Sequence, residues 1–381
     1  MTIYILVLLA FLTHVGFGGS RLAVPLFAID QGATPFIVGT IAALYAAFPV
    51  VLALPAGRLS DRLGFRIPLV FGTSGVCIAL LLPFFWPSLA TLYVTATLLG
   101  IGFMALQLGT QALAGAITTA EGRARNFSLL SLGFATANFV GPLVTGFLID
   151  EIGYARTFAA LALPLVPAII ISALGSRWLP PAELKTESVH GSALELLRIK
   201  PLRDTLIASA IVAGAWDVYQ FFMPIYGRAQ DLSATAIGVV MSAFAVAIIL
   251  VRVVLPFAVR RAGEAQLLTY AMFVASAAFC LFPMFHTAWP LAAVSFLLGI
   301  GCGCGQPLSM TMVFNATPKG RAGEATGMRI TANQLTHTII PLLFGALGTA
   351  AGYAAVFLTN AACLVAGGYI SWRTQRSRSR E

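Results

Sequence analysis

Charged residues are scarce in this chain of 381 residues, because Asp, Glu, Lys and Arg together make up only 10% of it. An ordinary soluble domain has about 25%. Hydrophobic residues make up 59%, and the mean hydropathy is +0.89. These values exclude a soluble globular domain and a disordered chain, and the 36 glycines show no fixed period that would suggest collagen. A helical protein that crosses a membrane several times remains.

Cysteine is scarce as well, and each of the five cysteines lies inside an apolar run. Cys302 and Cys304 are separated by one residue, whereas a typical zinc pair has at least two residues between its ligands. The sequence therefore predicts neither a disulfide scaffold nor a metal site, and we expect no cofactor. The net charge of +9 comes from basic residues spread over the loops between apolar segments, so we expect no nucleic-acid partner.

Twelve segments are long and apolar enough to span a bilayer as helices, which takes about 20 residues each. The first six lie near residues 3–27, 36–57, 67–86, 89–117, 127–149 and 155–176. The other six lie near residues 204–227, 235–258, 265–285, 288–316, 323–348 and 352–372. The first segment has no basic region before it and is too long for a signal peptide, so we expect it to remain in the protein. The predicted fold class is an all-α membrane protein with two halves of six transmembrane helices.

The longest polar stretch separates the two sets of helices. We predict an N-terminal half at 1–178, a cytoplasmic linker at 179–203, a C-terminal half at 204–373 and a basic tail at 374–381. Within the linker, residues 192–198 have the pattern of a short amphipathic helix on the membrane surface, although a plain linker is equally compatible with the sequence. We expect the protein to be a monomer.

The basic residues predict how the chain lies in the membrane. Of the 23 Lys and Arg residues, 18 lie in the tail and in the loops on one side, three lie on the other side, and Arg252 and Arg329 lie within spans. The positive-inside rule places the richer side in the cytoplasm. We therefore predict a multi-pass protein of the cell membrane, the inner membrane in a bacterium, with both termini cytoplasmic.

The two halves are repeats of each other at a constant offset of 199 residues. Leu98–Gly102 corresponds to Leu297–Gly301 in this way. The same offset relates Gly39 to Gly238, Pro142 to Pro341 and Gly146 to Gly345. Parallel repeats of this kind place a substrate site between the halves near the bilayer midplane, and rocking of the halves opens it to alternate sides.

A short motif with glycine, arginine and one acid follows the second span. Its key residues are Gly57, Asp61, Arg62, Gly64 and Arg66. Glycines permit a tight turn, and an acid flanked by arginines can form a network that breaks when the halves move. The motif resembles the loop signature of the major facilitator superfamily, although Phe65 stands where that family usually has arginine. The resemblance implies that these five residues form a conformational switch; a positively charged stop loop is the alternative.

The fifth span contains Gly141, Pro142 and Gly146. This spacing resembles the Gly-Pro motif of the superfamily's antiporters, with Ala137 and Thr145 at positions where glycine is common. The resemblance favours efflux over uptake. A kinked packing face is the alternative, because small residues four apart allow helices to cross closely and proline bends a helix.

Asp217 is the one acid that we place deep within a span. Ionisable residues are costly inside a bilayer and are functional candidates by default. The family's usual fourth-span arginine is replaced here by Ala96. If protons drive the transporter, Asp217 is the natural proton carrier.

The resemblance also implies which helices line a central cavity, namely the first, fourth, seventh and tenth. Their polar residues, with two from the eleventh helix, are the predicted substrate-binding set: His14, Gln107, Gln111, Gln220, Gln306, Asn333 and His337. Each has a plainer alternative, because amides often bond only a neighbouring helix and histidines can be satisfied helix contacts. For Arg21 the plainer alternative is an extension to the outer membrane surface, and we expect Arg252 to extend to the cytoplasmic surface.

Together these features predict a secondary active transporter that exports a small organic molecule in exchange for protons. Its partners would be the solute, protons and the bilayer. The alternative is an uptake symporter for a small organic anion, which the excess of intramembrane Arg and His over acids favours. An integral-membrane enzyme or receptor is a remote alternative, because the sequence has no nucleophile elbow or paired-histidine metal motif.

Overall fold

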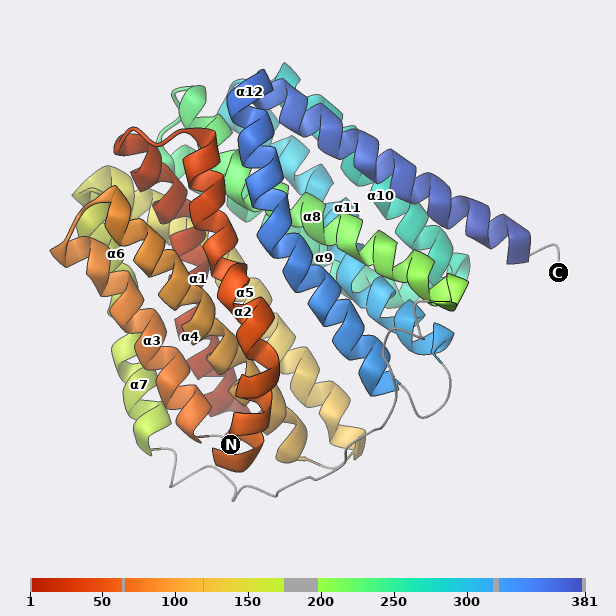
Figure 1. Ribbon diagram of the computed structural model, residues 1–381, viewed down its shortest axis with the longest axis horizontal. Helices are drawn as coiled ribbons and strands as arrows, with labels where there is room; N and C mark the ends of the chain where they lie inside the picture. Colours follow the sequence, from red (N-terminus) through yellow and green to blue (C-terminus); the bar gives the residue numbers. More distant parts are fainter. Residues whose placement is uncertain (1, 64–65, 119, 175–197, 318–321, 379–381) are drawn as a thin grey trace.

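The computed structural model describes residues 2–63, 66–118, 120–174, 198–317 and 322–378. The N-terminal half consists of α1 (Thr2–Asp30), α2 (Pro35–Leu63), α3 (Arg66–Phe85), α4 (Leu89–Ala116), α5 (Ala120–Ile152), α6 (Tyr154–Ala162) and α7 (Leu165–Ala173). The C-terminal half consists of α8 (Lys200–Ala229), α9 (Ala234–Ala262), α10 (Glu264–Leu281), the short 3-10 helix η3 (Phe282–Met284), α11 (Ala288–Ala316) and α12 (Ala322–Arg378). Figure 1 shows the two halves side by side as separate helix bundles.

Eleven helical segments of the described chain are long and apolar enough to cross a membrane. The last of them, Met328–Arg373, has 46 residues, which is about twice what one crossing needs. Gly352 interrupts it with φ 80°, a conformation that glycine adopts without strain, and the ribbon reverses direction within α12 (Figure 1). The segment therefore makes two crossings, and the predicted twelve-helix arrangement in two halves is confirmed.

The sixth crossing differs from the continuous span near residues 155–176 that the hydropathy predicts. It consists of α6 and α7, which are separated by Leu163 and Pro164. Proline cannot donate a hydrogen bond to the preceding turn, so the helix ends and restarts there. At the other boundary, α8 begins at Lys200, inside the segment predicted as linker, while residues 179–197 lie outside the described residues.

Helix packing within the two halves follows the repeat. A Cβ built on Gly100 would collide with the backbone of Tyr45, and a Cβ built on Gly299 would collide with that of Phe244. These four residues are related pairwise by the offset of 199. The fourth helix of each half thus approaches the second helix at one glycine, where no larger residue fits.

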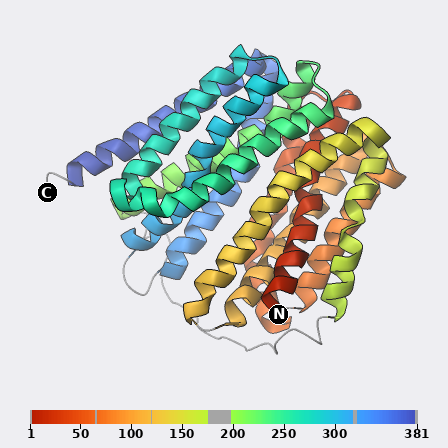
Figure 2. The same cartoon turned by 180° about the vertical axis from the view of Figure 1, so that it is seen from behind.

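Two symmetric crossings join the halves, α5 with α9 and α2 with α12. A Cβ on Gly238 of α9 would lie 2.5 Å from the carbonyl oxygen of Pro142, and one on Gly39 of α2 would collide with the carbonyl oxygen of Pro341. Each crossing therefore places a glycine directly against the backbone of a proline, and the two glycines and the two prolines are repeat partners. Figure 2 shows α5 and α9 converging at one end and separating toward the end that carries the N-terminus.

At the converging end, each crossing ends in a hydrogen bond from a helix N-terminus of one half to a side chain of the other. The Asp150 carboxylate accepts from the backbone N–H groups of Ala234 (3.1 Å) and Thr235 (2.8 Å) at the start of α9. The Thr349 hydroxyl accepts from the backbone N–H of Phe36 (3.0 Å) at the start of α2. Asp150 and Thr349 are repeat partners, as are Phe36 and Thr235. We call these two contacts the latches.

Candidate functional site

A cavity of about 320 Å³ lies between the halves. Seven helices contribute to it: α1, α4 and α5 from the N-terminal half and α8, α9, α11 and α12 from the C-terminal half. Its polar lining consists of His14, Arg21, Gln107, Asn138, Ser209, Asp217, Gln220, Arg252, Gln306, Ser309 and His337. A cavity of this size suits a small organic molecule.

Asp217 is the centre of the site's charge. Its side chain is 5% exposed, and both carboxylate oxygens have a partner. Oδ1 lies 3.7 Å from Nη1 of Arg21 on α1, and Oδ2 forms a hydrogen bond with Nδ1 of His337 on α12. The carboxylate therefore connects the N-terminal half to the C-terminal half through Arg21.

Arg21 is held over aromatic rings as well as beside the acid. Its guanidinium carbon lies 5.4 Å from the ring centre of Phe17 and 5.6 Å from that of Tyr45, within cation–π range. The Tyr45 hydroxyl in turn lies 3.0 Å from Ser20 Oγ. Arg21 thus points inward to Asp217, which is at variance with the alternative that it extends to the outer membrane surface.

Arg252 also differs from the sequence-based expectation. Its Nη1 donates to the backbone oxygen (3.4 Å) and the hydroxyl (2.7 Å) of Ser131 on α5, and the side chain lines the cavity. The expectation that it extends to the cytoplasmic surface was therefore wrong. The signal was present in the sequence, since an arginine inside an apolar span is a functional candidate by default.

A polar network covers the wall formed by the C-terminal half. Arg329 is 9% exposed, and its Nη1 donates to Gln306 Oε1 and Ser309 Oγ, both at 3.2 Å. Ser209 Oγ lies 3.3 Å from Ser309 Oγ and 3.2 Å from Asn333 Oδ1. Arg329 and Asn333 stand behind the lining, which Gln306, Ser309 and Ser209 form.

The predicted substrate-binding residues, apart from Asn333, lie in two kinds of place. His14, Gln107, Gln220, Gln306 and His337 line the cavity, and their role in substrate binding stays a prediction. Gln111 is exposed on α4 and is not among the lining residues. Sequence reasoning did not single out Asn138, Ser209 or Ser309, because serine and asparagine are common helix contacts and only the packing brings these three to the cavity.

His14 lies in an aromatic setting. It is 8% exposed, and its ring centre lies 5.0 Å from those of both Phe103 and Phe134. Neither ring nitrogen makes a hydrogen bond with a residue that the structure describes. A buried imidazole without a partner is available to a ligand in the cavity.

No described residue of the two sequence motifs is among those that line the cavity. Gly141 packs on α1, where a Cβ would lie 2.9 Å from the backbone nitrogen of Gly19, and Pro142 and Gly146 form the crossing with α9. Gly57, Asp61 and Arg62 belong to the last turns of α2, and their side chains and Gly64 lie outside the described residues. Arg66 donates from Nη2 to the backbone oxygen of Ala173, at 2.6 Å, at the end of α7.

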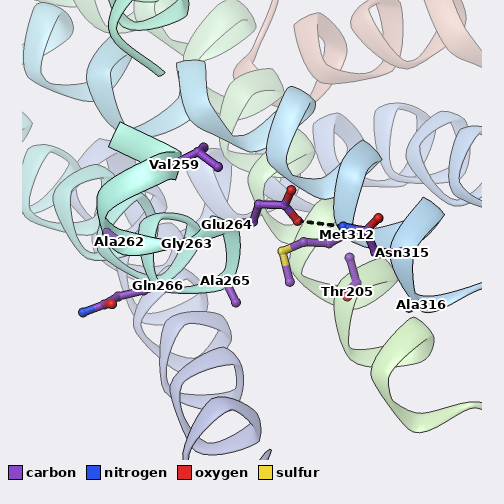
Figure 3. A pocket seen from close by; sticks show the side chains of 10 residues that line it. All are labelled: Thr205, Val259, Ala262, Gly263, Glu264, Ala265, Gln266, Met312, Asn315 and Ala316. Carbon is purple, nitrogen blue, oxygen red and sulfur yellow. Dashed lines mark hydrogen bonds between the residues drawn. The ribbon is translucent and has the colours of Figure 1, made fainter. Parts of the chain in front are cut away.

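A second hollow, of about 570 Å³, lies within the C-terminal half where α9 ends and α10 begins. Figure 3 shows the Glu264 carboxylate pointing to Asn315, whose Nδ2 donates to it at 3.2 Å. No residue of the N-terminal half lines it among those that the structure describes. Among the described residues, no three His, Cys, Asp or Glu side chains are grouped as metal ligands would be.

The fold and the cavity between pseudo-symmetric halves define a transporter that works by alternating access. A family model described as Major Facilitator Superfamily matches residues 6–284 and 205–381, so the chain belongs to this superfamily. It is a multi-pass membrane protein and a secondary active transporter.

Named relatives agree with this assignment. The tetracycline resistance protein, class C, of Escherichia coli is 28% identical over 330 residues, which are 81% of this chain and 79% of the relative. The class G protein of Vibrio anguillarum is 27% identical over 329 residues, 82% of this chain and 80% of the relative.

Among solved structures, the nucleoside transporter NupG, in a point-mutant form, has a TM-score of 0.84 at 13% identity, and the match covers 98% of this chain and 99% of that one. A POT family transporter in complex with a thioalcohol conjugated peptide has the same TM-score and identity, with 98% and 96% covered. These structural likenesses concern the fold.

Proposed function

We propose that this protein exports a small organic solute from the cytoplasm in exchange for protons, and that Asp217 carries the proton. The observation that supports this most is the placement of Asp217 inside the cavity, bonded to Arg21 of one half and His337 of the other. Protonation removes the charge that holds Arg21, so one proton changes a contact between the halves.

The way the halves are joined indicates which conformation the structure has. The latches close one end of the molecule, and the halves separate toward the end that carries the N-terminus (Figure 2). The positive-inside rule supports a cytoplasmic position for that end. In this arrangement the conformation faces inward, which is the state in which an exporter would bind its solute and an importer would release it.

The cycle then has two coupled steps. With Asp217 ionised, the ion pair with Arg21 and the latches favour the inward-facing state. Outward opening breaks the latches and exposes Asp217 to a compartment richer in protons. A proton on Oδ1 or Oδ2 releases Arg21, the solute leaves, and the return inward carries the proton to the cytoplasm. His337, within hydrogen-bond reach of Oδ2, orients the carboxylate and can pass the proton on.

Export is supported by the tetracycline resistance proteins among the relatives and by the Gly-Pro crossing of α5 with α9. Uptake of a small organic anion together with a proton is the second candidate, favoured by two intramembrane arginines, Arg252 and Arg329, that have no acidic partner among the described residues. An enzyme or a receptor has no supporting observation in the cavity, where among the described residues no nucleophile lies beside an activated base.

The proposal is tested with Asp217→Asn in proteoliposomes, with tetracycline as the first solute and others found by the rise in melting temperature that binding causes. We expect the variant to lose transport driven by a pH gradient and to keep exchange of labelled for unlabelled solute, because exchange needs no net proton movement. Asp231→Asn is the matched control, since Asp231 is exposed in the loop after α8 and has φ 56°, which asparagine tolerates. Gradient-driven transport that survives in Asp217→Asn would overturn the assignment of the proton carrier.

A further inference from the structure

Positive charge exceeds negative charge around the cavity. Asp217 is the one acid that lines it within the described part of the chain, and Arg21 already pairs with that acid. Arg252 lines the cavity and has no acid within ion-pair distance among the described residues, and the same holds for Arg329 behind the wall. Apart from the histidines, the lining therefore carries one unmatched positive charge, that of Arg252, and Arg329 adds a second behind the wall.

The partners of these two arginines are neutral. Arg252 donates to Ser131, and Arg329 donates to Gln306 and Ser309. Nε of Arg329 makes no hydrogen bond with a described residue. Neutral hydroxyls and amides compensate a guanidinium only in part when it is removed from water, so both sites favour an incoming anion.

A cationic solute has no comparable partner. Both oxygens of Asp217 are engaged, Oδ1 by Arg21 and Oδ2 by His337. A cation would have to displace Arg21 and leave a third guanidinium unpaired. The charge pattern thus selects against cations as well as for anions.

The apolar part of the lining is aromatic. Phe17 and Phe103 are stacked with their ring centres 3.9 Å apart, and Trp216 lines the cavity as well. The planar faces of these rings suit the apolar or aromatic body of a solute. Gln107 and Asn138 add hydrogen-bonding groups.

We infer that the cavity binds an organic anion whose carboxylate, or an equivalent oxyanion, pairs with Arg252 while its aromatic or aliphatic body lies against Phe103 and Trp216. The planar guanidinium fork matches a carboxylate with two parallel hydrogen bonds. The inference builds on the proposed function and names the class of solute that it leaves open.

The same arginine borders another hollow, of about 520 Å³, between α5 and α9, where Phe127 and Leu132 also lie. An acidic lipid headgroup could offer the same oxyanion chemistry from that side. The experiment is therefore made in nanodiscs of phosphatidylcholine, which has no net charge, and repeated with phosphatidylglycerol.

Binding to the purified full chain is measured by calorimetry with three probes of similar shape: phenylbutyrate, phenylbutyramide and phenylbutylamine. They are anionic, neutral and cationic near neutral pH. We expect phenylbutyrate to bind at least about tenfold more tightly than the other two, since a hydrogen-bonded charge pair is worth about one power of ten or more in affinity. The inference is overturned if the amide or amine binds as well as the carboxylate, or if the carboxylate shows no binding at millimolar concentration.

Variants identify the subsite. Arg252→Gln should weaken phenylbutyrate binding by about tenfold or more, Arg252→Lys by less, and Arg260→Gln not at all, because Arg260 is an exposed cation on the same helix. Phe103→Ala should also weaken it, which separates the cavity from the lipid-side hollow. Competition by phosphatidylglycerol with no effect of Phe103→Ala would mean that a lipid is the occupant and would overturn the inference.

These measurements need neither a proton gradient nor transport. A preference for the amine or amide would therefore overturn the solute class and leave proton coupling through Asp217 standing. Conversely, if transport needs no proton gradient while the cavity still binds carboxylates in preference, only the proposed coupling is overturned.

Discussion

Loss of the Asp150 latch should shift the protein toward the conformation in which the latched end is open, by an amount that follows from two hydrogen bonds. Asp150→Ala removes a carboxylate that accepts two backbone N–H groups at the N-terminus of α9, at 3.1 and 2.8 Å. An anion at a helix N-terminus is worth about 0.3–1 kcal/mol, and loss of a helix cap costs about 0.5–2 kcal/mol. Because Asp150 is exposed and screened by solvent, we take about 1 kcal/mol, which corresponds to a shift of about fivefold in the equilibrium between the two conformations.

Labelling of a buried position at the latched end measures this shift. Val38 is 1% exposed and lines a small apolar hollow there with Pro25 and Tyr45, so Val38→Cys in a cysteine-free background should react with an impermeant maleimide only when that end opens. We expect Asp150→Ala to raise the labelling rate about fivefold, and Thr349→Val to raise it by a smaller factor because it removes one neutral hydrogen bond.

Glu151→Ala is the matched control. It removes an adjacent, exposed negative charge for which the structure gives no hydrogen bond at the helix N-terminus among the described residues. An equal rise in Glu151→Ala, or no rise in Asp150→Ala, would refute the latch, because the effect would then come from surface charge or be absent.

Three further predictions concern topology, the loop motif and the helix crossings. Single cysteines at Arg62, Arg123, Lys319 and Arg373 should react with an impermeant reagent only after lysis, and external labelling of any of them would contradict the predicted orientation. Asp61→Asn should slow turnover more than it weakens solute binding, because Asp61 lies in the last turns of α2 and no described residue of α2 lines the cavity; an affinity loss as large as the transport loss argues against a switch role. Gly238→Ala should destabilise the protein by about 1–3 kcal/mol, because its Cβ would lie 2.5 Å from the Pro142 oxygen, and thermal unfolding should show no such loss for Gly18→Ala, whose Cβ has 3.7 Å to its nearest neighbour.

The architecture could be predicted from the sequence because the features that define it depend on residues close together in the chain or on short repeated matches. Each span needs only a run of apolar residues, and the offset of 199 could be read from short matches such as that of Gly39 to Gly238. The break in the sixth span was also readable at Pro164, where the hydropathy alone suggested a continuous helix.

The site was only partly predictable because its contacts join residues far apart in the chain. Asp217 could be singled out as a buried acid, but its partners Arg21 and His337 lie 196 and 120 residues away, and no spacing rule connects them. Arg252 was placed at the surface because it lies near a helix end, and only the packing of α5 on α9 turns it to Ser131. The latches were missed for the same reason, since each joins a side chain near a helix end of one half to a helix start of the other.

Proton movement caused by the solute tests the central claim most directly. Proteoliposomes that contain a pH-sensitive dye report protons that cross when solute is added on one side, with no imposed gradient. The account predicts that wild-type protein moves protons opposite to the solute, that Asp231→Asn does the same, and that Asp217→Asn moves none while still exchanging solute. Proton flux of wild-type size in Asp217→Asn, or flux in the same direction as the solute, would contradict export coupled through Asp217.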